Sequence, residues 1–149
     1  IIEDAFLMVA EQLRLRNIAV QRQLSPALPK VVGDANQLEQ VILNLLTNAR
    51  DAIDAKGAGA PGQIDMITRR SGADNESVEI LVKDSGVGIA PEDRGKIFDP
   101  FFTTKEVGKG TGLGLSISYG IMKDHQGDIA VLETGPEGTT FRMTLPVEQ

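Results

Sequence analysis

The sequence predicts an α+β fold, a two-layer α/β sandwich in which a mixed, mostly antiparallel sheet packs on about three helices. Apolar residues recur at helical spacing in two segments, and they alternate with period two in four others. One face of such a sheet packs on the helices, whereas the other is more polar. With 149 residues, of which 41% are hydrophobic, we expect a single domain spanning 1–149 with its own core.

The N-terminal half predicts a helix, a strand and a second helix. Residues 1–16 carry a helical pattern, and residues 18–24 predict a short strand that ends at the proline turn 25–29. Asp34 followed by Gln37 forms a capping-box start for the second helix, which ends in the glycine-rich run 57–62. The apolar faces of the two helices are expected to consist of Ile2, Phe6, Val9, Leu13 and Leu15, and of Leu38, Val41, Ile42, Leu45, Leu46, Ala49 and Ile53.

The C-terminal half predicts four strands, one long loop and a third helix. The strands are marked by alternating residues, namely Ile64 and Met66; Val78, Ile80 and Val82; Ile129 and Val131; and Phe141, Met143 and Leu145. The last two strands pair as a hairpin around the turn 135–138. Residues 85–112 show little periodicity, which is typical of a functional lid or a disordered segment, and a helix from about Leu113 to Asp124 follows.

Composition excludes several classes of function. The net charge of −6 argues against a nucleic-acid surface, and the absence of cysteine excludes disulfides and thiolate metal sites. No apolar run approaches the roughly 20 residues of a membrane helix. Because the chain begins at Ile1 without a methionine or a signal peptide, we expect a fragment of a longer protein. An acidic chain can bind a polyanion only through locally concentrated donors or a metal ion.

The second helix carries a pair of asparagines at the edge of its apolar stripe. Asn44 and Asn48 are four residues apart, so their amides point the same way, and Asp51 falls on the same strip. Amide oxygens are suitable ligands for Mg²⁺, which keeps several waters while substrate phosphates complete its shell. The alternative is a pair of solvated or helix-packing asparagines.

The strand that ends at Asp84 predicts a buried carboxylate. Asp84 shares strand parity with Val82, so its side chain faces the core where the strand ends. A buried carboxylate needs hydrogen-bond donors, and the N6 amino group of adenine is one, whereas guanine presents an acceptor there. Gly86 and Gly88 let the backbone turn sharply and approach a flat ring. The alternative is an ordinary turn that ends a strand.

The long loop contains a glycine block and a phenylalanine cluster. The run Gly108–Gly114 enters a helix, so its backbone N–H groups and the helix N-terminus can bind an anion, with Lys105 and Lys109 as nearby charges. Its spacing fits neither a Walker loop nor a dinucleotide fingerprint, and a plain hinge is the alternative. Three phenylalanines either anchor a lid or belong to the core, namely Phe98, Phe101 and Phe102. His125, at the end of the third helix, is expected to be structural.

These blocks together resemble a known family. The segments 44–52, 84–88, 98–102 and 110–114 are similar in order and spacing to the N, G1, F and G2 boxes of the ATP-binding catalytic domain of two-component sensor histidine kinases. Residues 138–141 resemble the final glycine block of that family. The wider superfamily includes DNA gyrase, the Hsp90 chaperones and MutL. The resemblance covers essentially the whole chain and implies a Bergerat-type ATP-binding fold.

The resemblance implies roles for individual residues. Asn48 would be the Mg²⁺ ligand and Asn44 would support it through the water shell of the metal. Asn44, Lys105 and Lys109 would be the catalytic residues, with the lysines reaching the terminal phosphates. Many family members have a lysine where this chain has Asp51, which makes the γ-phosphate more dependent on the lid lysines. The implied nucleotide-binding residues are Asn44, Asn48, Asp51, Asp84, Gly86, Gly88, Ile89, Phe102, Thr103, Lys105, Lys109, Gly110, Thr111, Gly112, Leu113, Gly114, Leu115, Thr139 and Thr140.

The resemblance also implies a reaction and partners. The domain would bind Mg²⁺ and ATP and transfer the γ-phosphoryl group to a histidine on a separate dimerisation and phosphoacceptor helical domain, so it could not autophosphorylate alone. A response regulator would receive the phosphoryl group from the full-length, homodimeric, cytoplasmic or membrane-anchored kinase, while the isolated domain would be a cytoplasmic monomer. Three alternatives remain: a serine-directed anti-sigma-type kinase, an ATP-gated conformational ATPase, and an interaction module that no longer uses ATP. The ATPase class places a glutamate where this chain has Asn44.

Overall fold

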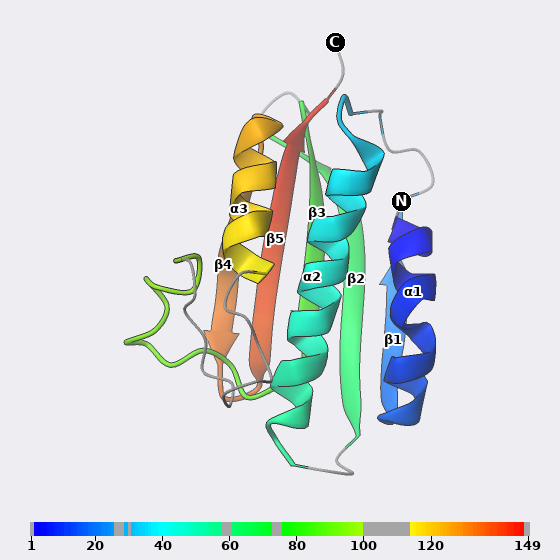
Figure 1. Cartoon of the computed structure of the whole chain (residues 1–149), viewed down its shortest axis with the longest axis vertical. Helices are drawn as coiled ribbons and strands as arrows, with labels where there is room; N and C mark the ends of the chain where they lie inside the picture. The colour runs from blue at the N-terminus through cyan, green and yellow to red at the C-terminus, as the bar shows by residue number, and fades with distance from the viewer. Residues whose placement is uncertain are drawn as a thin grey trace.

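The computed structural model describes residues 2–25, 29, 31–57, 61–72, 76–99 and 114–147. Figure 1 shows a helical layer packed on one face of a sheet, which confirms the predicted α/β sandwich. In chain order the elements are α1 (Ile2–Leu15), β1 (Ile18–Gln23), α2 (Ala35–Asp54), β2 (Gly62–Ser71), β3 (Ser77–Asp84), α3 (Gly114–Asp124), β4 (Asp128–Gly135) and β5 (Gly138–Pro146).

The sheet is mixed and mostly antiparallel, as predicted. Its strand order is β1-β2-β3-β5-β4, and only the edge pair β1 and β2 is parallel. The helix α2 crosses the middle of the sheet between α1, which lies beside β1 and β2, and α3, which lies over β4 and β5 (Figure 1). Among the described residues, no helix is both long enough and apolar enough to cross a bilayer.

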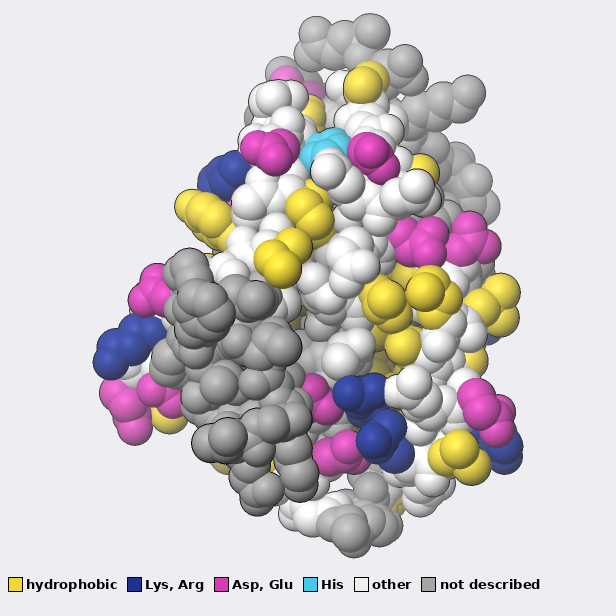
Figure 2. Space-filling view, in the orientation of Figure 1, with side chains coloured by type: hydrophobic (Ala, Val, Ile, Leu, Met, Phe, Trp, Pro, Cys, Tyr) yellow, Lys and Arg dark blue, Asp and Glu magenta, His cyan; other side chains and the backbone are white. Residues whose placement is uncertain are grey.

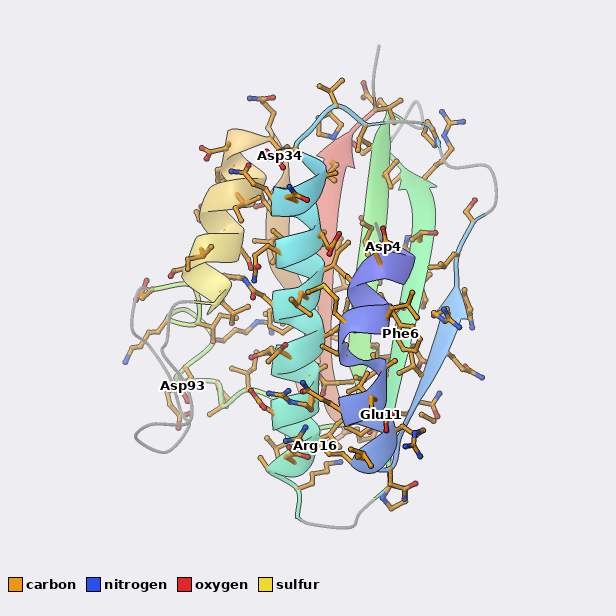
Figure 3. All side chains as sticks on the ribbon, turned by 45° about the vertical axis from the view of Figure 1, so that its right-hand side comes forward. Asp4, Phe6, Glu11, Arg16, Asp34 and Asp93 are labelled. Atoms are coloured by element: carbon orange, nitrogen blue, oxygen red, sulfur yellow. The ribbon has the colours of Figure 1, made fainter. Side chains whose placement is uncertain are left out.

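The helix α2 forms as its sequence predicts. The Asp34 side chain accepts a hydrogen bond from the Gln37 backbone N–H at 3.1 Å, so this residue caps the first turn. Figure 3 shows Asp34 at the start of α2 and Arg16 near its other end, where Arg16 pairs with Asp54 at 2.9 Å. All the residues of the predicted apolar face are buried: Leu38, Val41, Ile42, Leu45, Leu46, Ala49 and Ile53.

Among the side chains that the structure describes, the predicted apolar face of α1 is wrong in one residue, and the Ile2 side chain lies outside that description. Leu15 is 71% exposed, whereas Leu13 is buried. Residues two apart on a helix differ by about 200° in direction, so the two leucines cannot share a face. Ala5 and Val9 precede Leu13 at intervals of four residues and are buried with it. The buried face of α1 is therefore set by this spacing of four.

The two faces of β3 are less different than alternation predicts. Val78, Ile80 and Val82 face the helices and are buried, but Glu79 and Leu81 on the other face are only 5% exposed. Glu79 pairs with Arg69 on β2 at 2.8 Å and with Arg142 on β5 at 3.6 Å. We attribute the low exposure of this face to the long arginine side chains, which can cover the face of β3 that points away from the helices.

The segment after β3 returns to the core before residue 100. Ile97 is buried, and the Phe98 ring lies 5.7 Å from the Tyr119 ring and 6.5 Å from the Phe141 ring. The Phe98 ring therefore packs against one residue of α3 and one of β5, which agrees with both predicted readings, a lid anchor and a core residue. Phe101 and Phe102 lie outside the described residues.

Candidate functional site

The Asp84 carboxylate is buried at the end of β3, as its parity predicts. The residue is 2% exposed, and its Oδ1 accepts hydrogen bonds from the backbone N–H groups of Gly86 at 2.8 Å and Thr139 at 3.3 Å. Burial raises the pKa of the Asp84 carboxyl above its usual range, and the two N–H groups and the charge of Lys56 offset this only in part. Because both bonds go to Oδ1, the second oxygen can accept from a further donor.

Gly86 allows the turn after β3 to pack directly on α2. A Cβ on Gly86 would lie 2.5 Å from the Cβ of Ala52 and 2.7 Å from its carbonyl oxygen. The backbone N–H of Val87 donates to that same oxygen at 3.1 Å. The sequence predicted a glycine for close approach to a flat ring, whereas the close approach in the structure is to the α2 backbone.

The next part of the loop is held by the β4–β5 hairpin. Gly88 has φ +80°, and a Cβ there would lie 2.0 Å from the Gly135 carbonyl oxygen. The backbone N–H of Ile89 donates to Thr134 Oγ1 at 2.8 Å, and this hydroxyl lies 2.9 Å from that of Thr139. The loop after Asp84 is therefore fixed by polar contacts on both sides.

Sequence reasoning missed Thr134. A register shift between Val131 and Glu133 inserts a residue into β4, so Thr134 pairs with Thr139 on the helix-facing side. Simple alternation from Ile129 and Val131 assigns residue 134 to the other face. The only signal in the sequence is a polar β-branched residue next to a glycine turn, which is common in hairpins.

The asparagine-bearing strip of α2 lies beside the first turns of α3. Asn44 Nδ2 donates to Gly114 O at 3.1 Å and to Ser118 Oγ at 3.0 Å, and Asn44 Oδ1 accepts from Gln40 Nε2 at 2.7 Å. The Asn48 side chain is half-buried, and within the described ranges no hydrogen bond engages its amide. The first asparagine is thus tied to α3, whereas the oxygen of the second has no partner among the described residues.

One row of α2 connects the two ends of the site. Asn44, Asn48 and Ala52 follow one another at intervals of four residues, so they are neighbours along the helix surface. Asn44 contacts the first turn of α3, and Ala52 contacts the loop after Asp84. Asn48 therefore lies between these two contacts. The structure brings together groups that are separated by up to 74 positions in the sequence.

The remaining predicted site residues lie in different places. Thr139 is buried beside Asp84, and Leu115 is half-buried against the core. Thr140 is the next residue on β5 and pairs with Lys83, so its side chain lies on the opposite face of the sheet from Thr139. Only the backbone of Thr140 is near Asp84. Asp51 accepts from Arg50 Nη2 at 3.1 Å. Eight predicted residues lie outside the described residues: Phe102, Thr103, Lys105, Lys109, Gly110, Thr111, Gly112 and Leu113.

His125 has a structural role, as predicted. Its Nε2 accepts from the backbone N–H of Asp34 at 3.0 Å, and its Nδ1 lies 2.8 Å from the Ile121 carbonyl oxygen. The first contact requires an unprotonated Nε2, so the second is a donated bond from Nδ1–H. Figure 2 shows the histidine where the end of α3 meets the start of α2. It therefore links these helix ends.

The described part of the chain offers amide oxygens on α2 as candidate ligands for a cation. No group of three or more histidine, aspartate or glutamate residues gathers there as a metal site. Asn48 presents an unengaged amide at the border of the core, which suits a hard cation whose remaining ligands are waters and phosphates. These donors fit Mg²⁺ delivered with a nucleotide rather than a resident structural metal.

The sequence of this chain matches a known protein family and known relatives. Residues 33–149 match the family described as histidine kinase-, DNA gyrase B-, and HSP90-like ATPase. Sporulation kinase E of Bacillus subtilis (strain 168) is 36% identical over 149 residues, which span 100% of this chain and 19% of that protein. The chain therefore covers about a fifth of the length of this relative.

Two solved structures show the same arrangement. The catalytic domain of histidine kinase ThkA, in a nucleotide-free form, is 33% identical with a TM-score of 0.82 over 98% of this chain and 91% of its own. A second ThkA structure, in complex with the response regulator protein TrrA, is 31% identical with a TM-score of 0.76 over 99% of this chain and 39% of its own. The chain therefore belongs to the histidine kinase-, DNA gyrase B-, and HSP90-like ATPase family, as an ATP-binding domain of the sensor histidine kinase type.

Proposed function

We propose that this chain binds Mg²⁺–ATP and transfers the γ-phosphoryl group to a histidine on a separate dimerisation and phosphoacceptor domain. In this proposal residues 1–149 form one catalytic domain of a longer, homodimeric kinase that acts in the cytoplasm. The observation that carries it is the buried Asp84 carboxylate, which keeps one oxygen for an external donor and lies at one end of a row that contains Asn48.

Asp84 would recognise the base. Its Oδ1 is held by two backbone N–H groups, so Oδ2 can accept from the N6 amino group of adenine. Guanine presents a carbonyl oxygen at that position and would be repelled by the carboxylate. The burial that raises the pKa of Asp84 also strengthens any hydrogen bond it accepts, because the local dielectric is low.

Asn48 and Asn44 would hold the metal side of the nucleotide. Bound Mg²⁺ would supply the positive charge that offsets the negative charge of the phosphates. Asn48 would offer its amide oxygen as a ligand, and Asn44 would accept from the water shell through Oδ1. Neither amide oxygen would have to break a buried hydrogen bond to do so. The Asn48 amide has no partner within the described ranges, and Asn44 Oδ1 accepts there only from the exposed Gln40 amide.

The transfer itself needs little covalent chemistry from this domain. A lone pair on the acceptor histidine nitrogen attacks the γ-phosphorus, the bond to the β–γ bridging oxygen breaks, and ADP leaves with that electron pair. The domain would contribute by positioning and charge stabilisation. Lys105, Lys109 and residues 110–114 would supply the donors around the terminal phosphates, a role that Asp51 cannot take because its carboxylate carries negative charge.

The proposal is tested by reconstitution with candidate phosphoacceptor domains. The chain is mixed with helical-hairpin fragments and ATP labelled with ³²P in the γ position. We expect label on the fragment that is lost in acid and kept in base, as phosphohistidine is, and no label with the Asp84→Asn variant. Acid-stable label would instead support the serine-directed alternative. Release of phosphate without a labelled protein would support the conformational ATPase.

A receiving response regulator is the further partner of this proposal. Histidine kinase ThkA has been solved in complex with the response regulator protein TrrA, and this chain is similar to that kinase over its catalytic domain. We expect the isolated chain to be a monomer, since dimerisation would belong to the helical domain.

A further inference from the structure

Ser118 is a fully buried polar residue that the proposed chemistry does not use. It lies in the second turn of α3 with 0% of its surface exposed. Its hydroxyl donates to the Gly114 carbonyl oxygen, four residues earlier, at 2.8 Å. Ser118 Oγ in turn accepts a hydrogen bond from Asn44 Nδ2 on α2 at 3.0 Å. A buried hydroxyl therefore connects the first turn of α3 to the asparagine strip.

These contacts determine which way the Asn44 amide points. The Gly114 oxygen can only accept, so the Asn44 atom that lies 3.1 Å from it must be the N–H₂ group. The hydrogen of the Ser118 hydroxyl is already donated to Gly114, so the hydroxyl can only accept from Asn44. The Gly114 oxygen and the Ser118 hydroxyl thus both require that the Asn44 amide atom facing them is the nitrogen. The amide oxygen is left on the other side, where Gln40 donates to it at 2.7 Å.

We propose that Ser118 is a positioning residue, which holds the Asn44 amide nitrogen toward α3 and leaves the amide oxygen on the far side, where it can accept from the water shell of a bound cation in place of Gln40. This inference rests on the proposed function, because the direction of that oxygen matters only when a hydrated cation is bound there. Ser118 does not touch substrate. It acts through Asn44, in the way that outer hydrogen-bond partners orient the ligands of other metal sites.

The same contacts couple two parts of the site. Gly114 is the first residue of α3, and its carbonyl oxygen is held by both Ser118 and Asn44. A displacement of this turn would pull on the Asn44 amide nitrogen and rotate its oxygen. The position of the α3 N-terminus and the direction of the Asn44 oxygen therefore change together.

The test compares the affinity for a non-hydrolysable ATP analogue in excess Mg²⁺ and in EDTA. The measured quantity is the ratio of the two dissociation constants, which we call the Mg²⁺ enhancement. For Ser118→Ala we expect the enhancement to fall about tenfold while the affinity in EDTA stays within about twofold of wild type. Ser118→Thr should keep the wild-type enhancement, since a threonine hydroxyl in a helix also bonds to the carbonyl four residues earlier.

Ser77→Ala is the matched control. It removes the same atom from a half-buried serine at the opposite end of β3 from Asp84, and should leave the enhancement unchanged. If Ser118 only stabilises the α2–α3 packing, Ser118→Ala lowers the unfolding midpoint but keeps the wild-type enhancement, and the inference is overturned. If Ser118→Ala does not fold, Ser118→Cys replaces it with the same expectation, because a thiol is a weak hydrogen-bond partner.

A second readout needs neither metal nor nucleotide. In the ¹⁵N-labelled apo protein, the Asn44 side-chain amide protons should exchange slowly with solvent in wild type, and about tenfold faster in Ser118→Ala, since one of two acceptors is lost. Unchanged exchange in that variant would contradict the positioning role. Failure of the wild-type protein to bind the analogue at all would overturn the proposed function, whereas normal wild-type binding with an unchanged Ser118→Ala enhancement overturns only this inference.

Discussion

The backbone N–H of Thr139 donates to the carboxylate of Asp84 at 3.3 Å, across 55 positions of sequence. This hydrogen bond joins the start of β5 to the end of β3. Gly138, just before Thr139, lies so close that a Cβ on it would be 1.9 Å from the Asp84 carbonyl oxygen. The direction of the carboxylate is set by β5 and by the turn after β3, and in the proposed function it would be a rigid acceptor for the base of a nucleotide.

Replacing Asp84 with asparagine should remove adenine recognition. The asparagine oxygen can keep the two bonds from Gly86 and Thr139, but the second position becomes an N–H₂ group that faces the adenine amino group. We expect ATP binding to weaken at least tenfold, about 1.4 kcal/mol, by calorimetry. Asp65→Asn, on the other face of β2, is the control and should bind as wild type does. Wild-type affinity in Asp84→Asn would refute the adenine role.

The raised pKa of Asp84 has a consequence for stability. Its pKa is higher in the folded than in the unfolded protein because burial disfavours the charged form. The folded state therefore binds the proton more tightly, and stability from this group is full below the unfolded pKa and is lost as the pH rises through the folded pKa.

Denaturant unfolding over a pH series measures this effect. The free energy of unfolding of Asp84→Asn minus that of wild type should increase from about pH 4, near the ordinary aspartate pKa, upward and then level off. A difference that stays constant or decreases over this range would contradict a raised pKa. ATP affinity of wild type should decrease on the acidic side of the same range, since a protonated Asp84 is a poorer acceptor.

Asn48→Ala should abolish the Mg²⁺-dependent tightening of ATP binding. The fold should be kept, because in the described part of the chain the Asn48 amide makes no hydrogen bond, and alanine is the better helix former by roughly half a kcal/mol. Asn36→Ala, an exposed residue in the first turn of α2, is the matched control and should leave the tightening intact. If Asn48→Ala retains the wild-type dependence on Mg²⁺ in calorimetry, Asn48 is not a metal ligand.

Two glycine-to-alanine changes should have opposite signs. Gly138 has φ +135°, and its α-carbon faces the Asp84 backbone, so Gly138→Ala should destabilise the fold by more than about 2 kcal/mol. Gly120 lies on the exposed side of α3 with open space around it, so Gly120→Ala should stabilise by about 0.5–1 kcal/mol. Urea unfolding measures both. Equal effects at the two sites would show that the contact at Gly138 is not tight.

Local patterns predicted the elements and most of their buried faces. The α2 helix begins after the predicted cap at Asp34, and its buried residues are those of the predicted apolar face. The burial of Asp84 followed from strand parity alone. The prediction failed for Leu15, which lies on the opposite side of α1 from Leu13. Alternation alone also gave no sign that Glu79, on the more polar face of the sheet, is buried, because its partners Arg69 and Arg142 lie on neighbouring strands.

The sequence by itself determined the family, the type of each element and the residue types of the site, because caps, periodicity and motif spacing are properties of short segments. Only the tertiary structure decided which atoms meet. Thr139 at Asp84, Thr134 at Ile89 and Ser118 at Asn44 join residues 45 to 74 positions apart, and a register shift in β4 changes which side Thr134 faces. Hydrogen bonds depend on atoms being within about 3 Å and correctly oriented, a condition that packing of the whole sandwich sets and that no local pattern records.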